Sequence, residues 1–227
     1  MQEFDGKAFV VRVDEPTANT KTTTLIADLT FLAQQGVRPI LIAPTPGAAQ
    51  ALVRTINRSG NVAVGLSGAD AAMLPTSGSG SGIGKVQTGI LQTLTSAGYI
   101  PVVEPTAFSV FGSDVEIVAD DVAAAIASAT DAVRAIFFHA LGGIQDPQTA
   151  SLIDELTPAE ALAFSDDTDL PDDLRRALRA AALGVRGGVA AAQIIDGRVA
   201  HAAIVELLTT RHLGTQVTGS IYTGGSL

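Results

Sequence analysis

The residues best placed to do chemistry are polar groups that directly follow apolar, strand-like runs of the sequence. Asp14 and Glu15 follow the run 8–13, which itself carries Arg12. Other polar turns follow similar runs, at 44–47, 104–106 and 139–143. If the runs are parallel strands of one sheet, their carboxyl ends meet at one edge, where open α/β sheets bind ligands. We therefore expect these turns to form one site, although polar loops are also common on any surface.

The composition restricts the chemistry of such a site. The chain has no cysteine, which excludes disulfides, thiolate metal sites and a cysteine nucleophile. His139, His201 and His212 are scattered along the sequence, so we expect no metal site. The segment "GSGSGIGK" at 78–85 lacks the Walker spacing and the Ser or Thr after its Lys. A flexible loop or a small hairpin is expected there instead of a phosphate-binding loop.

Charge and hydropathy exclude two classes of partner. The net charge is −9, and only three of the 14 basic residues are lysines, which disfavours nucleic acid and anionic membranes. The chain has no Trp and 4% aromatic residues, too few for a base-stacking surface. No apolar run reaches the roughly 18 residues of a membrane span, and the acidic N-terminus is unlike a signal peptide. We expect a cytoplasmic protein without a membrane or nucleic-acid partner.

Apolar runs and helical patterns alternate along the chain, which predicts an α/β fold with a mainly parallel sheet and right-handed crossovers. The expected strands are 8–13, 38–44, 62–68, 99–108 and 135–140. The expected helices between and after them are 22–36, 47–60, 89–98, 121–132 (capped by Asp120 or Asp121), 157–165 and 171–184. Thr157 and Glu160 have the spacing of a capping box. The C-terminal segment predicts a strand, an Asp-Gly turn, a helix and a last strand.

Several segments resemble the amino-acid kinase family, and within it the acetylglutamate kinases. They are "VGLSGADAAML", "LTSAGYIPVVEPTAFS", "EIVADDVAAAIA" and "QIIDGRVAHAAIVELLTTRHLGT", and the similarity spans nearly the whole chain. The resemblance implies a three-layer αβα sandwich forming one domain over 1–227. Its substrate-side half would cover about 1–130 and its nucleotide-side half about 131–227. It also implies Mg-ATP-dependent phosphorylation of the side-chain carboxylate of N-acetyl-L-glutamate, in arginine biosynthesis, and a homodimer.

The same resemblance assigns roles to individual residues. Arg12 stands where the family has a catalytic Lys, and Asp120 is the last residue of its Asn-x-Asn-Ala-Asp motif. Gly47 and Glu116 fall at substrate-binding positions. The implied nucleotide-binding and effector-binding residues are, respectively, His139, Gly142, Gly143, Arg175 and Arg176, and Glu206 and Gly214. Taken alone, Glu206 is compatible with a ligand contact or with a solvated helix face.

The chain departs from the family mainly where the chemistry would occur. Asp14 and Glu15 replace two glycines, and Pro44 and Pro46 replace a glycine-rich turn and remove N–H donors. Ala177 stands at the second family Lys, and the substrate-clamping hairpin is missing near Gly60. The resulting hypothesis is a degenerate kinase whose phosphotransfer is weak or lost. It would use Mg-ATP if active and no cofactor otherwise.

Three alternatives remain open from the sequence. The first is an active carboxylate kinase in which Arg12, Arg175 or Arg176 replaces the lysines. The second is a regulatory or binding subunit for arginine or another small carboxylate or amino acid. The third is a structural partner, equivalent to the kinase-like domain of bacterial N-acetylglutamate synthases.

Overall fold

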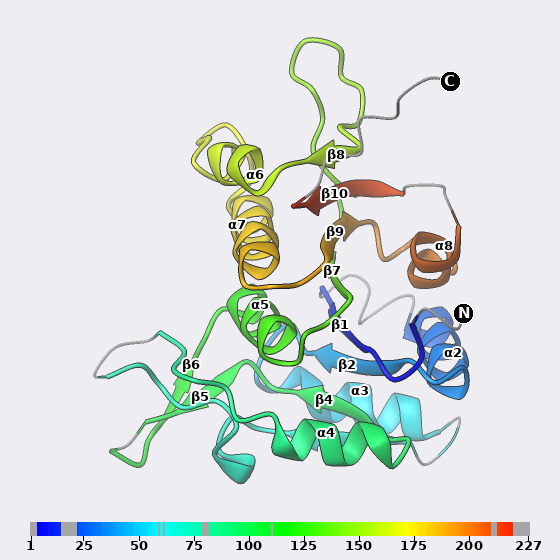
Figure 1. The fold of residues 1–227 in the computed structure, drawn as a ribbon, viewed down its shortest axis with the longest axis vertical. Helices are drawn as coiled ribbons and strands as arrows, with labels where there is room; N and C mark the ends of the chain where they lie inside the picture. Colours follow the sequence, from blue (N-terminus) through cyan, green and yellow to red (C-terminus); the bar gives the residue numbers. More distant parts are fainter. Residues whose placement is uncertain are drawn as a thin grey trace.

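The protein is built around one eight-stranded sheet whose strand order is β3-β4-β2-β1-β7-β9-β10-β8 (Figure 1). The computed structural model describes residues 4–14, 22–58, 60, 62–78, 82–109, 111–209 and 213–219. Only the β9–β10 pair is antiparallel; the other neighbours are parallel. The strands are β1 (Ala8–Arg12), β2 (Arg38–Ile42), β3 (Ala63–Leu66), β4 (Ile100–Val103), β7 (Arg134–Phe138), β8 (Glu155–Leu156), β9 (Ala191–Ile195) and β10 (Gly214–Thr218).

Helices cover both faces of this sheet, which makes the three layers. One face carries α2 (Thr22–Gln34), α3 (Ala48–Asn57) and α8 (Ala202–Leu208). The other carries α4 (Gly89–Ser96), α5 (Ala119–Ala129), α6 (Pro158–Ser165) and α7 (Asp172–Arg186). The α/β fold with a mainly parallel sheet is therefore confirmed. No helix within the described segments is long and apolar enough to cross a bilayer.

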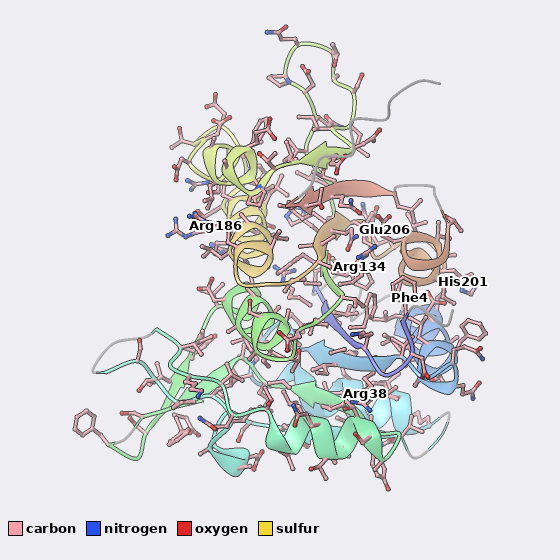
Figure 2. The ribbon with its side chains drawn as sticks, in the orientation of Figure 1. Phe4, Arg38, Arg134, Arg186, His201 and Glu206 are labelled. Atoms are coloured by element: carbon pink, nitrogen blue, oxygen red, sulfur yellow. The ribbon has the colours of Figure 1, made fainter. Side chains whose placement is uncertain are left out.

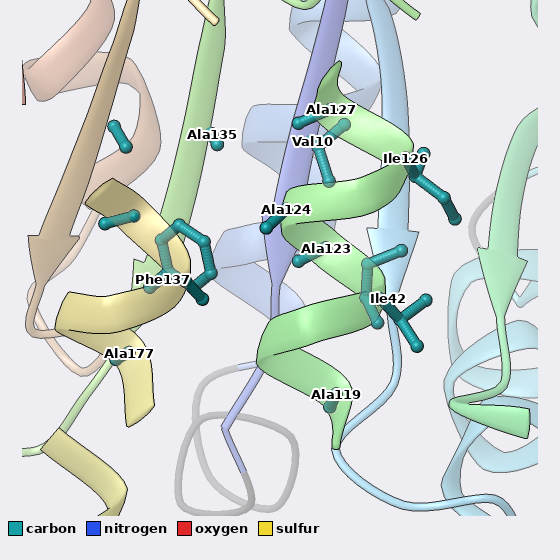
Figure 3. Close-up of a cluster of buried hydrophobic side chains, with 14 of the residues drawn as sticks. Val10, Ile42, Ala119, Ala123, Ala124, Ile126, Ala127, Ala135, Phe137 and Ala177 are labelled. Carbon is teal, nitrogen blue, oxygen red and sulfur yellow. The ribbon is translucent and has the colours of Figure 1, made fainter. Parts of the chain in front are cut away.

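The second face is packed mainly with small and branched side chains (Figure 3). Ala123 and Ala127 of α5 lie against Val10 of β1, and Phe137 of β7 fills the space beside α7. Because the α5 side chains that face the sheet are small, the helix can lie close to the strands while the interior stays densely packed. This close approach holds the first turn of α5 over the carboxyl end of β1.

Local sequence signals explain how the helices begin. The capping box is confirmed, because Thr157 accepts a hydrogen bond from the Glu160 backbone while the Glu160 carboxylate accepts from the Thr157 backbone. The cap expected for α5 is wrong. Its N-cap is Val118, and Asp120 lies inside the first turn, where it pairs with another side chain instead of capping the helix.

The expected strand 99–108 is two strands in two sheets. Pro105 removes a donor at the point where β4 ends, and the chain turns into β5 (Thr106–Phe108). β5 pairs with β6 (Asp114–Glu116) as an antiparallel hairpin that projects from the body (Figure 1). The Gly/Ser-rich segment also forms a small hairpin, in which Thr76 pairs with Ile83.

The connection between α3 and β3 is short. α3 ends at Asn57 and β3 begins at Ala63, so residues 58–62 leave no room for a hairpin between them. The Asn57 side chain fixes this connection, since its Oδ1 accepts hydrogen bonds from the backbone of Val62 and Ala63 at 3.0 and 2.8 Å. As a result, β3 is an edge strand of the sheet with α3 directly beside it.

Candidate functional site

A cavity of about 470 Å³ opens at the carboxyl ends of β1, β2 and β7, where the sequence places three of its four polar turns; the turn at 104–106 does not line it. We call it the central cavity. Five predicted site residues line it: Arg12, Glu116, Asp120, His139 and Arg176. Asp14, Pro44, Thr45 and Asp173 complete its polar rim. Gly47, Gly142, Gly143 and Arg175 are not among its lining residues.

Arg12 is held in a buried, bidentate ion pair. Its Nε lies 2.8 Å from Asp120 Oδ1, and its Nη2 donates to Asp120 Oδ2 at 2.9 Å. Its Nη1 donates to the Phe138 carbonyl oxygen at 2.8 Å. Arg12 is 8% exposed and Asp120 2%. The two N–H groups of Arg12 that hold Asp120 are the pair that would otherwise bind a phosphate. The Asp120 carboxylate balances the positive charge of Arg12.

The other cation of the cavity is also engaged. Arg176 and Arg175 both bind Asp172, in the first turn of α7. The carboxylates of Asp14, Glu116 and Asp173 face the same space. Among the lining residues, acids therefore outnumber arginines, and the central cavity is acidic.

His139 connects β7 to the start of α7. It is 4% exposed, its Nδ1 accepts from the Leu141 backbone N–H at 3.2 Å, and its Nε2 lies 3.0 Å from Asp173 Oδ2. Burial raises the pKa of the Asp173 carboxyl, but the His139 charge and hydrogen bond, with backbone N–H donors, lower it overall. His139 therefore links the end of β7 to the first turn of α7.

The Asp173 contact predicts a dependence of stability on pH. A carboxyl whose folded pKa is lowered stabilises the fold above its unfolded pKa and loses that contribution as pH falls through the folded value. We expect the stability of the wild-type protein to fall more steeply below about pH 4 than that of Asp173→Asn. Urea denaturation from pH 6 to pH 3 measures this difference. Parallel curves for the two proteins would rule out the contact.

Within the described residues, the turn after β2 offers few backbone N–H donors to the central cavity. Pro44 and Pro46 contribute none, and Gly47 is the N-cap of α3. Gly143 has φ +145, and a Cβ there would lie 2.6 Å from Thr215 Oγ1, which accepts the Ile144 N–H. The glycine is therefore needed for packing. Phosphoryl transfer requires cations and N–H donors, and the two arginines among the described lining residues are both paired with carboxylates.

The two predicted effector residues lie away from the central cavity, near α8 and β10. Glu206 Oε2 accepts from the Leu213 backbone N–H at 2.9 Å. A Cβ on Gly214 would collide with the carbonyl oxygens of Ile194 and Gly142. Figure 2 shows Glu206 and Arg134 on the side of the sheet that α8 covers. Both predicted residues thus have structural roles here, whatever they bind.

Two further sequence expectations fall outside the described residues, those on Glu15 and His212. Within the described segments, no group of three or more histidines and carboxylates is arranged to hold a metal ion.

Comparison with known proteins identifies the fold family. The family model described as "Amino acid kinase family" matches residues 47–196. Acetylglutamate kinase of Nostoc sp. is 30% identical over 272 aligned positions, covering 98% of this chain and 91% of the relative. The chain belongs to the amino acid kinase family. The alignment with the Nostoc enzyme spans more positions than this chain has residues, so the chain lacks segments that the relative has. The short α3–β3 connection is in keeping with such a loss.

Other family members and solved structures agree. Acetylglutamate kinase of Erythrobacter litoralis is 39% identical over 132 residues, covering 58% of this chain and 44% of the relative. N-acetylglutamate synthase from Neisseria gonorrhoeae superposes with a TM-score of 0.78 at 22% identity, covering 97% of this chain and 61% of that one. Carbamate kinase from Giardia lamblia gives 0.67 at 11% identity, covering 94% and 98%. The family fold is thus shared even with relatives of low sequence identity.

Sequence reasoning missed the role of Asp173 in this family member. The available signal was the run Pro171-Asp172-Asp173, which places two carboxylates in the first turn of a helix. The partner, His139, was not visible, because the pair is brought together only by the packing of α7 against β7.

Proposed function

We propose that this chain is an acetylglutamate kinase-like protein in which phosphoryl transfer is weak or lost. The observation that carries the proposal is the bidentate, buried Arg12–Asp120 pair. By the sequence resemblance Arg12 stands where the family has a catalytic Lys, and here its charge is balanced by Asp120. The protein keeps the family sheet and a cavity at the strand ends, but both arginines among the described residues that line this cavity are paired with carboxylates.

The electrostatics of the central cavity support the same proposal. A triphosphate placed there would face Asp14, Glu116 and Asp173 without a free arginine among the lining residues. Unscreened like charges in a partly desolvated space repel strongly. Binding would require Arg12 to leave a buried carboxylate, and an unpaired buried charge is costly.

Calorimetric titration with Mg-ATP tests the proposal. We expect no heat and no rise in melting temperature up to millimolar nucleotide, with an active family member as the positive control. Micromolar binding followed by ADP production with N-acetyl-L-glutamate would overturn it. That result would favour the active kinase in which arginine replaces lysine.

A second candidate function is a regulatory subunit that binds arginine on the α8 side of the sheet. Gln193 is 1% exposed, its Nε2 donates to Gln216 Oε1 at 3.0 Å, and its own Oε1 has no hydrogen-bond partner within the described residues. A guanidinium could donate to this oxygen and to the nearby Glu206 carboxylate. The Neisseria gonorrhoeae synthase has been solved with L-arginine. That likeness motivates the choice of ligand.

Thermal shift measurements with L-arginine test this second candidate. A ligand of the native state raises the melting temperature. We expect a rise of several degrees at millimolar arginine in the wild type and a loss of that rise in Gln193→Leu. An unchanged melting temperature in the wild type would remove the candidate.

We also propose a homodimer. β3 leaves one edge of the sheet unpaired within the described residues, and α3 lies beside it. An open strand edge can extend into a second sheet. Sedimentation at micromolar concentration should give a mass of two chains, and a monomer at all concentrations would refute the proposal.

A further inference from the structure

A second cavity lies at the edge of the sheet, between α3 and the carboxyl ends of β3 and β4. It has a volume of about 310 Å³, and we call it the edge cavity. It shares no lining residue with the central cavity. At about 30 Å³ for each water, it holds roughly ten water molecules, which is enough for a small organic ligand. Gly65 forms part of its wall, and a Cβ there would meet only Val53 Cγ2, at 3.5 Å.

The edge cavity carries opposite charges that do not pair with each other. Arg54 of α3 and Glu104, which follows β4, both line it. Neither side chain makes a hydrogen bond or ion pair with any described residue. Arg54 is exposed and Glu104 is half-buried, so both charges are within reach of a ligand that enters the same concave space. The two groups are therefore positioned to interact with the two ends of a dipolar ligand.

The acidic side of the edge cavity is reinforced. Asp70 Oδ2 accepts from the Ser67 backbone N–H at 2.7 Å and from its hydroxyl at 3.2 Å, which fixes the carboxylate at the rim. Burial raises the pKa of Glu104, and the negative charges of Asp70 and Asp114 raise it further. A ligand cation placed beside Glu104 would offset the repulsion between its carboxylate and those of Asp70 and Asp114. A ligand carboxylate there would increase it.

We propose that the edge cavity binds a free α-amino acid as its zwitterion, with the carboxylate on Arg54 and the ammonium group on Glu104 and Asp70. Guanidinium–carboxylate contact supplies a strong, directional interaction at one end. Simple anions are repelled by the two acids, and simple cations leave Arg54 unpaired. N-acylated amino acids lack the ammonium group and are therefore poor ligands. The inference does not depend on the proposed function, because the two cavities are separate.

Thermal shift and calorimetry with the twenty proteinogenic L-amino acids test the proposal. We expect at least one of them to bind, and its N-acetyl and amide derivatives to bind at least tenfold more weakly. Glu104→Gln and Arg54→Gln should each weaken binding at least tenfold. Arg58→Gln is the matched control, since Arg58 lies at the exposed end of the same helix and outside the cavity. It should bind like the wild type.

Two further measurements separate this site from the others. Gly65→Val should narrow the edge cavity and weaken binding at least tenfold without lowering the melting temperature, because the strand accepts a branched residue. Gln193→Leu should leave binding unchanged. Absence of binding by all twenty amino acids would overturn the proposal. So would binding that survives Glu104→Gln, Arg54→Gln and Gly65→Val.

Discussion

Replacing Asp120 with alanine is expected to lower the free energy of unfolding by about 3–5 kcal/mol. The substitution leaves the Arg12 guanidinium buried without its counter-ion, in a site where Arg12 is only 8% exposed. The Phe138 carbonyl still accepts one hydrogen bond, but it carries no full charge. Chemical denaturation followed by circular dichroism measures the loss.

Two comparisons decide whether the cost comes from the unpaired charge. The double variant Arg12→Met/Asp120→Leu removes both charges and should recover most of the stability, because apolar replacement of a buried pair is often neutral. Asp172→Ala breaks the exposed pairs with Arg175 and Arg176 and should cost less than about 1 kcal/mol. If Asp120→Ala also costs less than 1 kcal/mol, the pair is not buried in solution.

The second large effect is expected at Gly214. An alanine Cβ at this position would lie within contact distance of two backbone oxygens, those of Ile194 and Gly142. Backbone oxygens cannot rotate away, so β9 and β10 must separate, and the cost should reach about 3 kcal/mol or more. Chemical denaturation of Gly214→Ala, followed by circular dichroism, measures this loss of stability.

Gly47→Ala is the matched control for that substitution. Its φ is −77°, and a Cβ there meets nothing within 4 Å. The change should be neutral or stabilise the protein by up to about 1 kcal/mol, through the lower entropy of the unfolded chain. Equal effects at the two glycines would contradict the close approach of β10 to β9.

Much of the fold could be predicted from sequence because the signals are local. Buried strands appear as apolar runs, and the Thr157–Glu160 capping box lies within one turn. The prediction failed where geometry depends on distant partners. The segment 99–108 was expected as one strand although its polar turn at 104–106 marked a break, and only the pairing of β5 with β6 shows that two sheets meet there.

The candidate site was predictable only in outline. The rule that strand ends meet at one edge placed Asp14, Pro44 and His139 together, whereas Arg12 and Asp120 were assigned by the family resemblance. It could not show that Arg12 and Asp120 pair with each other, because they are 108 residues apart and Asp120 looked like a helix cap. The unpaired charges of Arg54 and Glu104 had no sequence signal, since an exposed arginine and a loop acid are ordinary in isolation.

The position of β1 has a consequence for how the chain reaches its native state. β1 lies between β2 and β7, and Phe9 is in register with Arg134. During synthesis from the N-terminus, one side of this apolar strand has no partner until residues 134–138 have been made. Such long-range closure slows folding and leaves an exposed edge that favours aggregation. A nascent chain stopped near residue 130 is therefore expected to require a chaperone, whereas one extended past 138 should begin to protect its central strands.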